Sequence, residues 1–187
     1  MNIHEYRELV LKSENGSLTE YPAELHAIMG MNGEAGECID MIKKNIFQGH
    51  TFSVDVFLNE LGDVCWYTTL LADKLGLDFD RLVAEVKHDD IKLAYNPNDS
   101  KGLEYILEIN RQCGNLVYVF KSMERSKVSS MIKGLRSIRT IFYYVDKIAA
   151  IFDKTLEDIF EINKNKIETR YPNGFSVDNS INRTDNY

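Results

Sequence analysis

The stretch IMGMNGEAGECIDMIKKNI, residues 28–46, decides the fold class. Its apolar side chains recur three or four residues apart, at Ile28, Met31, Ala35, Cys38, Ile39, Ile42 and Ile46. This spacing is typical of one face of an α-helix, whereas a half-buried strand would alternate apolar and polar residues. The same spacing recurs in residues 57–75 and 128–152. The pattern predicts long amphipathic helices that pack through their apolar faces.

Prolines divide this helical pattern. The chain has three, Pro22, Pro97 and Pro172, and long proline-free stretches separate them. Because proline is costly inside a helix, each stretch can form long helices joined by short turns. We predict an all-α fold with helices near residues 3–13, 23–47, 54–75, 79–94, 103–124, 128–152 and 156–170.

Composition restricts the class of protein. The 187 residues are 44% apolar, which is enough to bury a core. A net charge of −7 argues against binding to nucleic acid or to an anionic membrane. No apolar run approaches the roughly 20 residues of a membrane span, and the N-terminus lacks a signal-peptide pattern. The three cysteines lack CxxC spacing and are typical of buried thiols, so we expect a cytoplasmic protein.

A faint internal repeat relates the two proline-free stretches. Tyr67 and Tyr144 align at the same offset as Phe79 and Leu156. One interpretation is a fused pair of similar bundles, with a first half at 1–97, a linker at 98–102 and a second half at 103–187. The alternative is that any two amphipathic helical hairpins would match this well.

Two acid pairs, Glu34/Glu37 and Glu60/Asp63, have the i,i+3 spacing that places both carboxylates on one side of a helix. Each pair lies at the edge of its helix's apolar arc, not opposite it. Two antiparallel helices packed through these arcs would therefore bring the four carboxylates together beside the core.

Four adjacent carboxylates repel one another and need a counter-charge. Oxygen ligands suit Mg²⁺, or Mn²⁺ in its place, so one interpretation is a divalent-cation site. Structural ion pairs with Lys43 and Lys44 are the alternative. A di-iron carboxylate site is disfavoured because it uses Glu-x-x-His pairs, which this region lacks.

These acids lie in motifs that resemble a known family. GEAGECIDMIKK (residues 33–44) and NELGDVCWY (residues 59–67) are similar to the two acidic motifs of the MazG-like nucleoside triphosphate pyrophosphohydrolases. The segment from Asn163 through Lys166 and Arg170 to Phe175 is similar to the family's C-terminal motif.

The resemblance implies a MazG-like helical bundle and a hydrolase of nucleotide metabolism. The reaction would convert a nucleoside or deoxynucleoside triphosphate and water to the monophosphate and pyrophosphate. The resemblance assigns catalysis and Mg²⁺ binding to Glu34, Glu37, Glu60 and Asp63. It assigns substrate binding to Lys43, Tyr67, Asn163, Lys166 and Arg170. Lys43 as a solvated helix end and Tyr67 as a core residue are the alternatives.

The two halves depart from the family pattern in complementary ways. The first half lacks the C-terminal motif near residues 87–97, and the second half has Gln112 and Asn115 where the first has acids. We therefore expect one composite site per chain, in a pseudo-dimeric monomer or a homodimer. A dUTP or dCTP diphosphatase of the same superfamily is an alternative function. So is a non-catalytic, nucleotide-binding regulatory bundle.

Overall fold

Helices make up most of the chain that the computed structural model describes, which comprises residues 1–14, 21–87, 101–122, 127–171, 174–176 and 181. They are α1 (Ile3–Ser13), α2 (Ala23–Gln48), α3 (Val54–Lys74), α4 (Phe79–Lys87), α5 (Lys101–Ser122), α6 (Lys127–Ile151) and α7 (Leu156–Arg170). No strand occurs among these residues, so the predicted all-α class is confirmed. None of the helices described is long and apolar enough to cross a membrane.

The helix bounds follow the sequence prediction closely where they can be compared. Residues 88–94 of the helix expected at 79–94, and residues 98–100 of the expected linker, lie outside the described residues. The last two residues of that linker, Lys101 and Gly102, belong to the first turn of α5.

Reciprocal side-chain caps fix the first residues of α1 and α7. At α1, the Glu5 backbone N–H donates to Asn2 Oδ1 at 2.8 Å, and the Asn2 N–H donates to Glu5 Oε2 at 3.2 Å. Thr155 and Asp158 form the same reciprocal capping box at α7. Such boxes satisfy backbone donors that have no partner within the helix, so they set the start of α1 and of α7.

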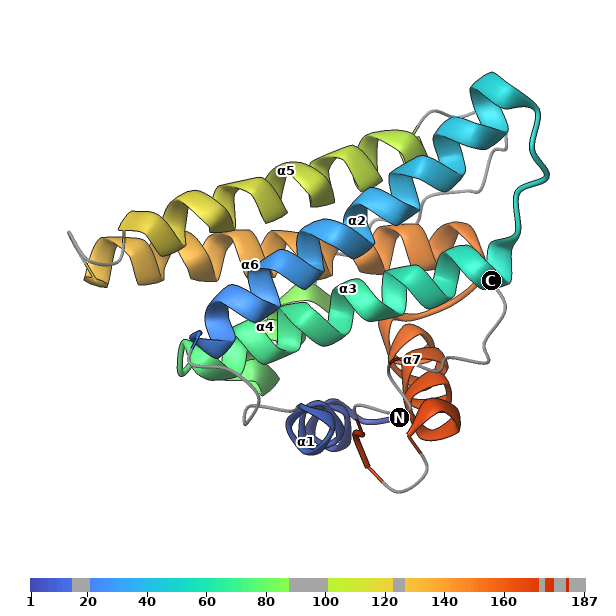
Figure 1. The fold of residues 1–187 in the computed structure, drawn as a ribbon. Helices are drawn as coiled ribbons and strands as arrows, with labels where there is room; N and C mark the ends of the chain where they lie inside the picture. The colour runs from blue at the N-terminus through green and yellow to red at the C-terminus, as the bar shows by residue number, and fades with distance from the viewer. Residues whose placement is uncertain (15–20, 88–100, 123–126, 172–173, 177–180, 182–187) are drawn as a thin grey trace.

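Two antiparallel hairpins form the body of the fold, and α1, α4 and α7 pack against them (Figure 1). The first hairpin is α2–α3 and the second is α5–α6, with α2 packed on α5 and α3 packed on α6. Helices α1 and α7 both pack on α3 and on each other. The helix α3 is therefore central, since it contacts α1, α2, α4, α6 and α7.

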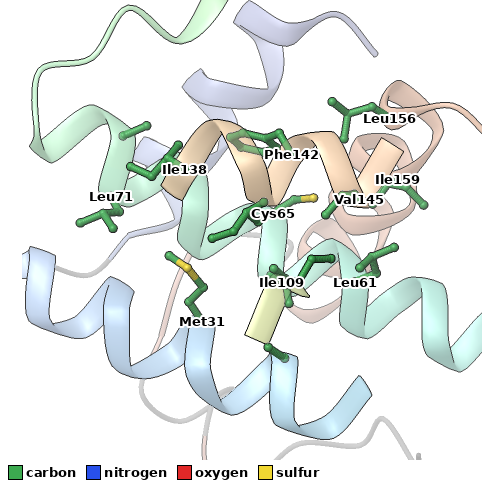
Figure 2. Packing of buried hydrophobic residues seen from close by; sticks show 14 of the residues in the cluster. Met31, Leu61, Cys65, Leu71, Ile109, Ile138, Phe142, Val145, Leu156 and Ile159 are labelled. Carbon is green, nitrogen blue, oxygen red and sulfur yellow. The ribbon is translucent and has the colours of Figure 1, made fainter. Parts of the chain in front are cut away.

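The hydrophobic core draws on both predicted halves of the chain. Met31 and Leu61 from the first hairpin lie in one buried cluster with Ile109, Ile138 and Phe142 from the second, as Figure 2 shows. Burying each such side chain contributes about 1.5–3 kcal/mol relative to leaving it exposed. Helix α5 thus packs on α2, and α6 and α7 pack on α3.

Helix α2 approaches α3 closely at Gly30. A Cβ atom built at Gly30 would lie 2.2 Å from Cζ of Tyr67, whereas one built at Gly33 would meet no atom within 4 Å. Gly30→Ala should lower the free energy of unfolding by about 1–3 kcal/mol, because the Tyr67 ring must move. Gly33→Ala, in the same helix, should raise it by up to about 1 kcal/mol through helix propensity. Urea denaturation measures both, and equal stabilisation by the two changes would contradict this packing.

Candidate functional site

Three glutamates converge where α2 and α3 pack together. The carboxylates of Glu34 and Glu37 on α2 and Glu60 on α3 each offer an oxygen within 4.8 Å of the others. Glu60 is only 4% exposed, Glu34 is half-buried and Glu37 is exposed. The cluster thus opens from the core towards the surface. As the apolar arcs predicted, the glutamates of α2 face Glu60 of α3.

The fourth predicted acid, Asp63, is held by α7. Asn163 Nδ2 donates to Asp63 Oδ1 at 2.7 Å, and Lys166 Nζ donates to Asp63 Oδ2 at 2.5 Å. The same ammonium group lies 3.7 Å from Glu60 Oε2. The ammonium group of Lys166 on α7 therefore contacts both acids of the α3 pair. The structure brings Asn163 and Lys166 to the acids, as the composite arrangement requires.

A fully buried tyrosine completes this contact. The Tyr6 hydroxyl donates to Asn163 Oδ1 at 2.8 Å and lies 3.5 Å from the Gly62 carbonyl oxygen. Its ring stacks on Phe160 with centroids 4.2 Å apart. A Cβ atom at Gly62 would lie 2.9 Å from Asn163 Cβ, so only glycine allows α7 this close to α3.

Burial and mutual repulsion govern the ionisation of the glutamates. Burial, followed by the charges of Asp63, Glu60 and Glu37, raises the pKa of Glu34 to about 8. Burial also raises the pKa of Glu60, and Lys166 opposes that rise. Without a further cation, the cluster therefore keeps protons at pH values above the range in which a carboxyl group usually ionises.

Lys43 forms an ion pair with an acid outside the cluster. Its ammonium group pairs with Asp40, as does that of Lys44 at 2.7 Å, and these bonds hold the pKa of Asp40 well below its usual range. The ion pairs of these lysines thus lie within one exposed part of α2. They differ from the structural pairs with Glu34 and Glu37 considered in the sequence analysis.

Tyr67 and Arg170 each lie one helical turn from a residue of the candidate site. Tyr67, one turn beyond Asp63, packs against Gly30 and meets the rings of His26 and Trp66 edge to face, with centroids 5.5 and 4.8 Å away. Arg170 is the half-buried last residue of α7, one turn beyond Lys166. The contact of either residue with a substrate stays a prediction.

The second hairpin carries amides at the positions that the repeat aligns with Glu34 and Glu37. Asn115 Nδ2 donates to Gln112 Oε1 at 3.2 Å, and Gln112 Nε2 donates to Glu108 Oε1 at 2.8 Å. These neutral groups satisfy one another by hydrogen bonding. They supply no paired carboxylates of the kind that α2 and α3 present.

Tyr6 is the supporting residue that the sequence reasoning missed. In the sequence it appears only as an apolar-spaced partner of Val10 in a short amphipathic helix. Nothing in that spacing indicates a hydroxyl directed at a residue 157 positions later. The only available signal was that a tyrosine in a core position usually finds a hydrogen-bond partner.

Comparisons with protein-family models, curated proteins and solved structures each found no match. The geometry and chemistry of the site are therefore the basis for assigning a function, since a helical fold alone implies none.

The pKa of Glu34 predicts how stability depends on pH. Folding raises this pKa from 4.5 to about 8. The contribution of protonated Glu34 to the free energy of unfolding is therefore complete below pH 4.5 and is lost as the pH rises through 8. In chelator, the melting temperature should therefore fall between about pH 5 and pH 8. Glu34→Gln, which cannot ionise, should reduce that fall.

Circular dichroism melts across this pH range measure the effect, with Glu8→Gln as the control because it removes an exposed carboxylate on α1. Saturating Mg²⁺ should raise the melting temperature more at the alkaline end, where protons no longer compete for the same oxygens. An identical slope in wild type and Glu34→Gln would exclude Glu34 as the source.

Proposed function

We propose that this protein is a Mg²⁺-dependent nucleoside triphosphate pyrophosphohydrolase that converts a nucleoside or deoxynucleoside triphosphate to the monophosphate and pyrophosphate. The observation that carries the proposal is the convergence of Glu34, Glu37 and Glu60 within 4.8 Å, with the Lys166 ammonium 3.7 Å from Glu60. Carboxylates that can bind a metal ion, placed beside a buried cation, suit a substrate that arrives as a metal-complexed polyphosphate. The similarity of both acidic motifs to the MazG-like family supports the same reaction.

The donor set fits a hard divalent cation. Glu34, Glu37 and Glu60 would hold it, and carboxylate oxygens are the ligands that Mg²⁺ and Mn²⁺ prefer. Cys38 lies next to these acids on α2, but burial and the nearby carboxylates raise the pKa of its thiol, which disfavours a soft thiolate site. When bound, Mg²⁺ neutralises phosphate oxygens and makes a water molecule more acidic.

The protein's own residues supply orientation, proton transfer and positive charge. A glutamate of the cluster accepts the proton of the attacking water, which requires a carboxylate within hydrogen-bond reach of it. Lys166, and Arg170 one turn away, stabilise the negative charge that develops on the leaving pyrophosphate. Lys43 and Tyr67 are proposed contacts for the outer phosphates and for the sugar or base.

The fold organisation proposed with this function is a fused pair of MazG-like bundles. The first hairpin provides the acids, and α7 of the second half provides Asn163, Lys166 and Arg170. The hydrogen bonds from Asn163 and Lys166 to Asp63 support one composite site per chain. In this arrangement a single chain carries a complete site, and association into a homodimer is an additional property to test.

Removing one carboxylate tests the assignment most directly. Glu37→Gln and Glu60→Gln should each abolish Mg²⁺-dependent turnover while the protein stays folded, because each removes one charged ligand of the site. A panel of nucleoside triphosphates, with pyrophosphate and orthophosphate measured separately, provides the readout and ranks the bases, including dUTP and dCTP. Asp55→Asn removes an exposed carboxylate from the same helix as Glu60 and should leave activity unchanged.

Full turnover in both glutamine variants would refute the site. Orthophosphate as the first product would keep the site but refute the reaction. Nucleotide binding without any product would instead support a non-catalytic binding protein.

Arg170→Ala should lower kcat or raise KM by at least about tenfold, which corresponds to about 1.4 kcal/mol. It should leave Mg²⁺ affinity without nucleotide nearly unchanged, because the proposed role of Arg170 is towards phosphate and not towards the ion. Lys164→Ala is the matched control, since Lys164 lies on the same helix and pairs with Glu161 at 3.2 Å. Equal kinetics in the two variants would contradict the role of Arg170.

A further inference from the structure

A continuous chain of hydrogen bonds, buried at Tyr6 and Asn163, links the N-terminal helix to the acid cluster. Tyr6 on α1 donates to Asn163 on α7 at 2.8 Å, and Asn163 donates to Asp63 on α3 at 2.7 Å. Both Tyr6 and Asn163 have zero exposed surface. Water therefore cannot replace either partner, and each link in the chain depends on the next.

Chemistry fixes the direction of this chain. An ionised carboxylate only accepts hydrogen bonds, so the amide nitrogen of Asn163 must face Asp63 and its oxygen must face Tyr6. That oxygen needs a donor, and the Tyr6 hydroxyl supplies it. With Lys166 on Oδ2 of Asp63, both carboxylate oxygens are then held from α7.

The hydroxyl of Tyr6 is not required to attach α1 to the core. The ring of Tyr6 stacks on Phe160, Trp66 Nε1 donates to Ser13 Oγ at 2.9 Å, and Arg7 pairs with Asp73. These contacts hold α1 on α3 and α7 without the Tyr6 hydroxyl. The hydroxyl is therefore free to serve the orientation of Asn163.

We propose that Tyr6 is a positioning residue: its hydroxyl orients the Asn163 amide, which in turn holds the Asp63 carboxylate in place beside the three glutamates. Asn163 then acts through Asp63 and not by contact with the substrate alone. This inference rests on the proposed function for its kinetic consequence, but the orientation of Asn163 is a property of the protein that can be measured without substrate.

Tyr6→Phe tests the proposal, because it removes the hydroxyl and keeps the stacked ring. We expect kcat to fall by about tenfold with little change in the KM for nucleotide, since Asp63 is misplaced and the nucleotide contacts remain. Ser13→Ala is the matched control, because it removes a hydroxyl of α1 that accepts from Trp66 on α3 and does not face Asn163, and its kcat should equal that of wild type. A similar loss of melting temperature in both variants would show that stability is not the cause.

A second measurement is independent of turnover. In nitrogen-15 NMR spectra the side-chain amide protons of Asn163 should exchange with solvent slowly in wild type and in Ser13→Ala. They should exchange at least about tenfold faster in Tyr6→Phe, because the buried acceptor has lost its donor. If Tyr6→Phe fails to fold, Asn163→Asp replaces it. That change keeps an acceptor for Tyr6 but directs a carboxylate at Asp63, and kcat should again fall.

The outcomes separate the two proposals. An active wild type with unchanged kcat in Tyr6→Phe, or in Asn163→Asp where that variant replaces it, overturns the positioning role and leaves the proposed function standing. A wild type inactive on every nucleotide overturns the proposed function, and amide exchange then decides the orienting role. Faster exchange in Tyr6→Phe but not in Ser13→Ala supports that role, and unchanged exchange in Tyr6→Phe overturns it.

Discussion

Repulsion between carboxylates packed at one helix interface is the constraint on which the arrangement of this protein depends. Burial and the neighbouring acids raise the pKa of Glu34 to about 8, so the cluster resists full ionisation. The Lys166 ammonium relieves part of this repulsion by contacting Asp63 at 2.5 Å and Glu60 at 3.7 Å. A divalent cation bound as proposed would relieve the rest.

The position of α7 follows from this need for a counter-charge. The helix reaches the acids because Gly62 leaves room for Asn163 and because α1 supports it from the other side. The central α3 therefore presents its acids to two helices at once, with the glutamates of α2 on one side and the cation of α7 on the other. The core and the acid cluster thus share α3, while α1 reaches the acids through Asn163 of α7.

The two hairpins differ in the side chains that they place at corresponding positions, carboxylates in α2 and amides in α5. In α5 the positions aligned with Glu34 and Glu37 are Gln112 and Asn115, which hydrogen-bond to each other as neutral groups. Neutral amides need no counter-charge, so these two positions of α5 do not require a cation such as Lys166. Because the two hairpins share one core, the second supports the first.

The sequence by itself determined the all-α class, nearly all the helix bounds and the facing of Glu34 and Glu37 towards Glu60. These features depend on residues near one another in the chain, through apolar periodicity, proline placement and i,i+3 spacing. Only the tertiary structure decided that Tyr67 packs on Gly30 and that Tyr6 reaches Asp63 through Asn163. The last of these contacts joins residues 100 or more positions apart, and local patterns carry no information about which distant helix will pack against which face.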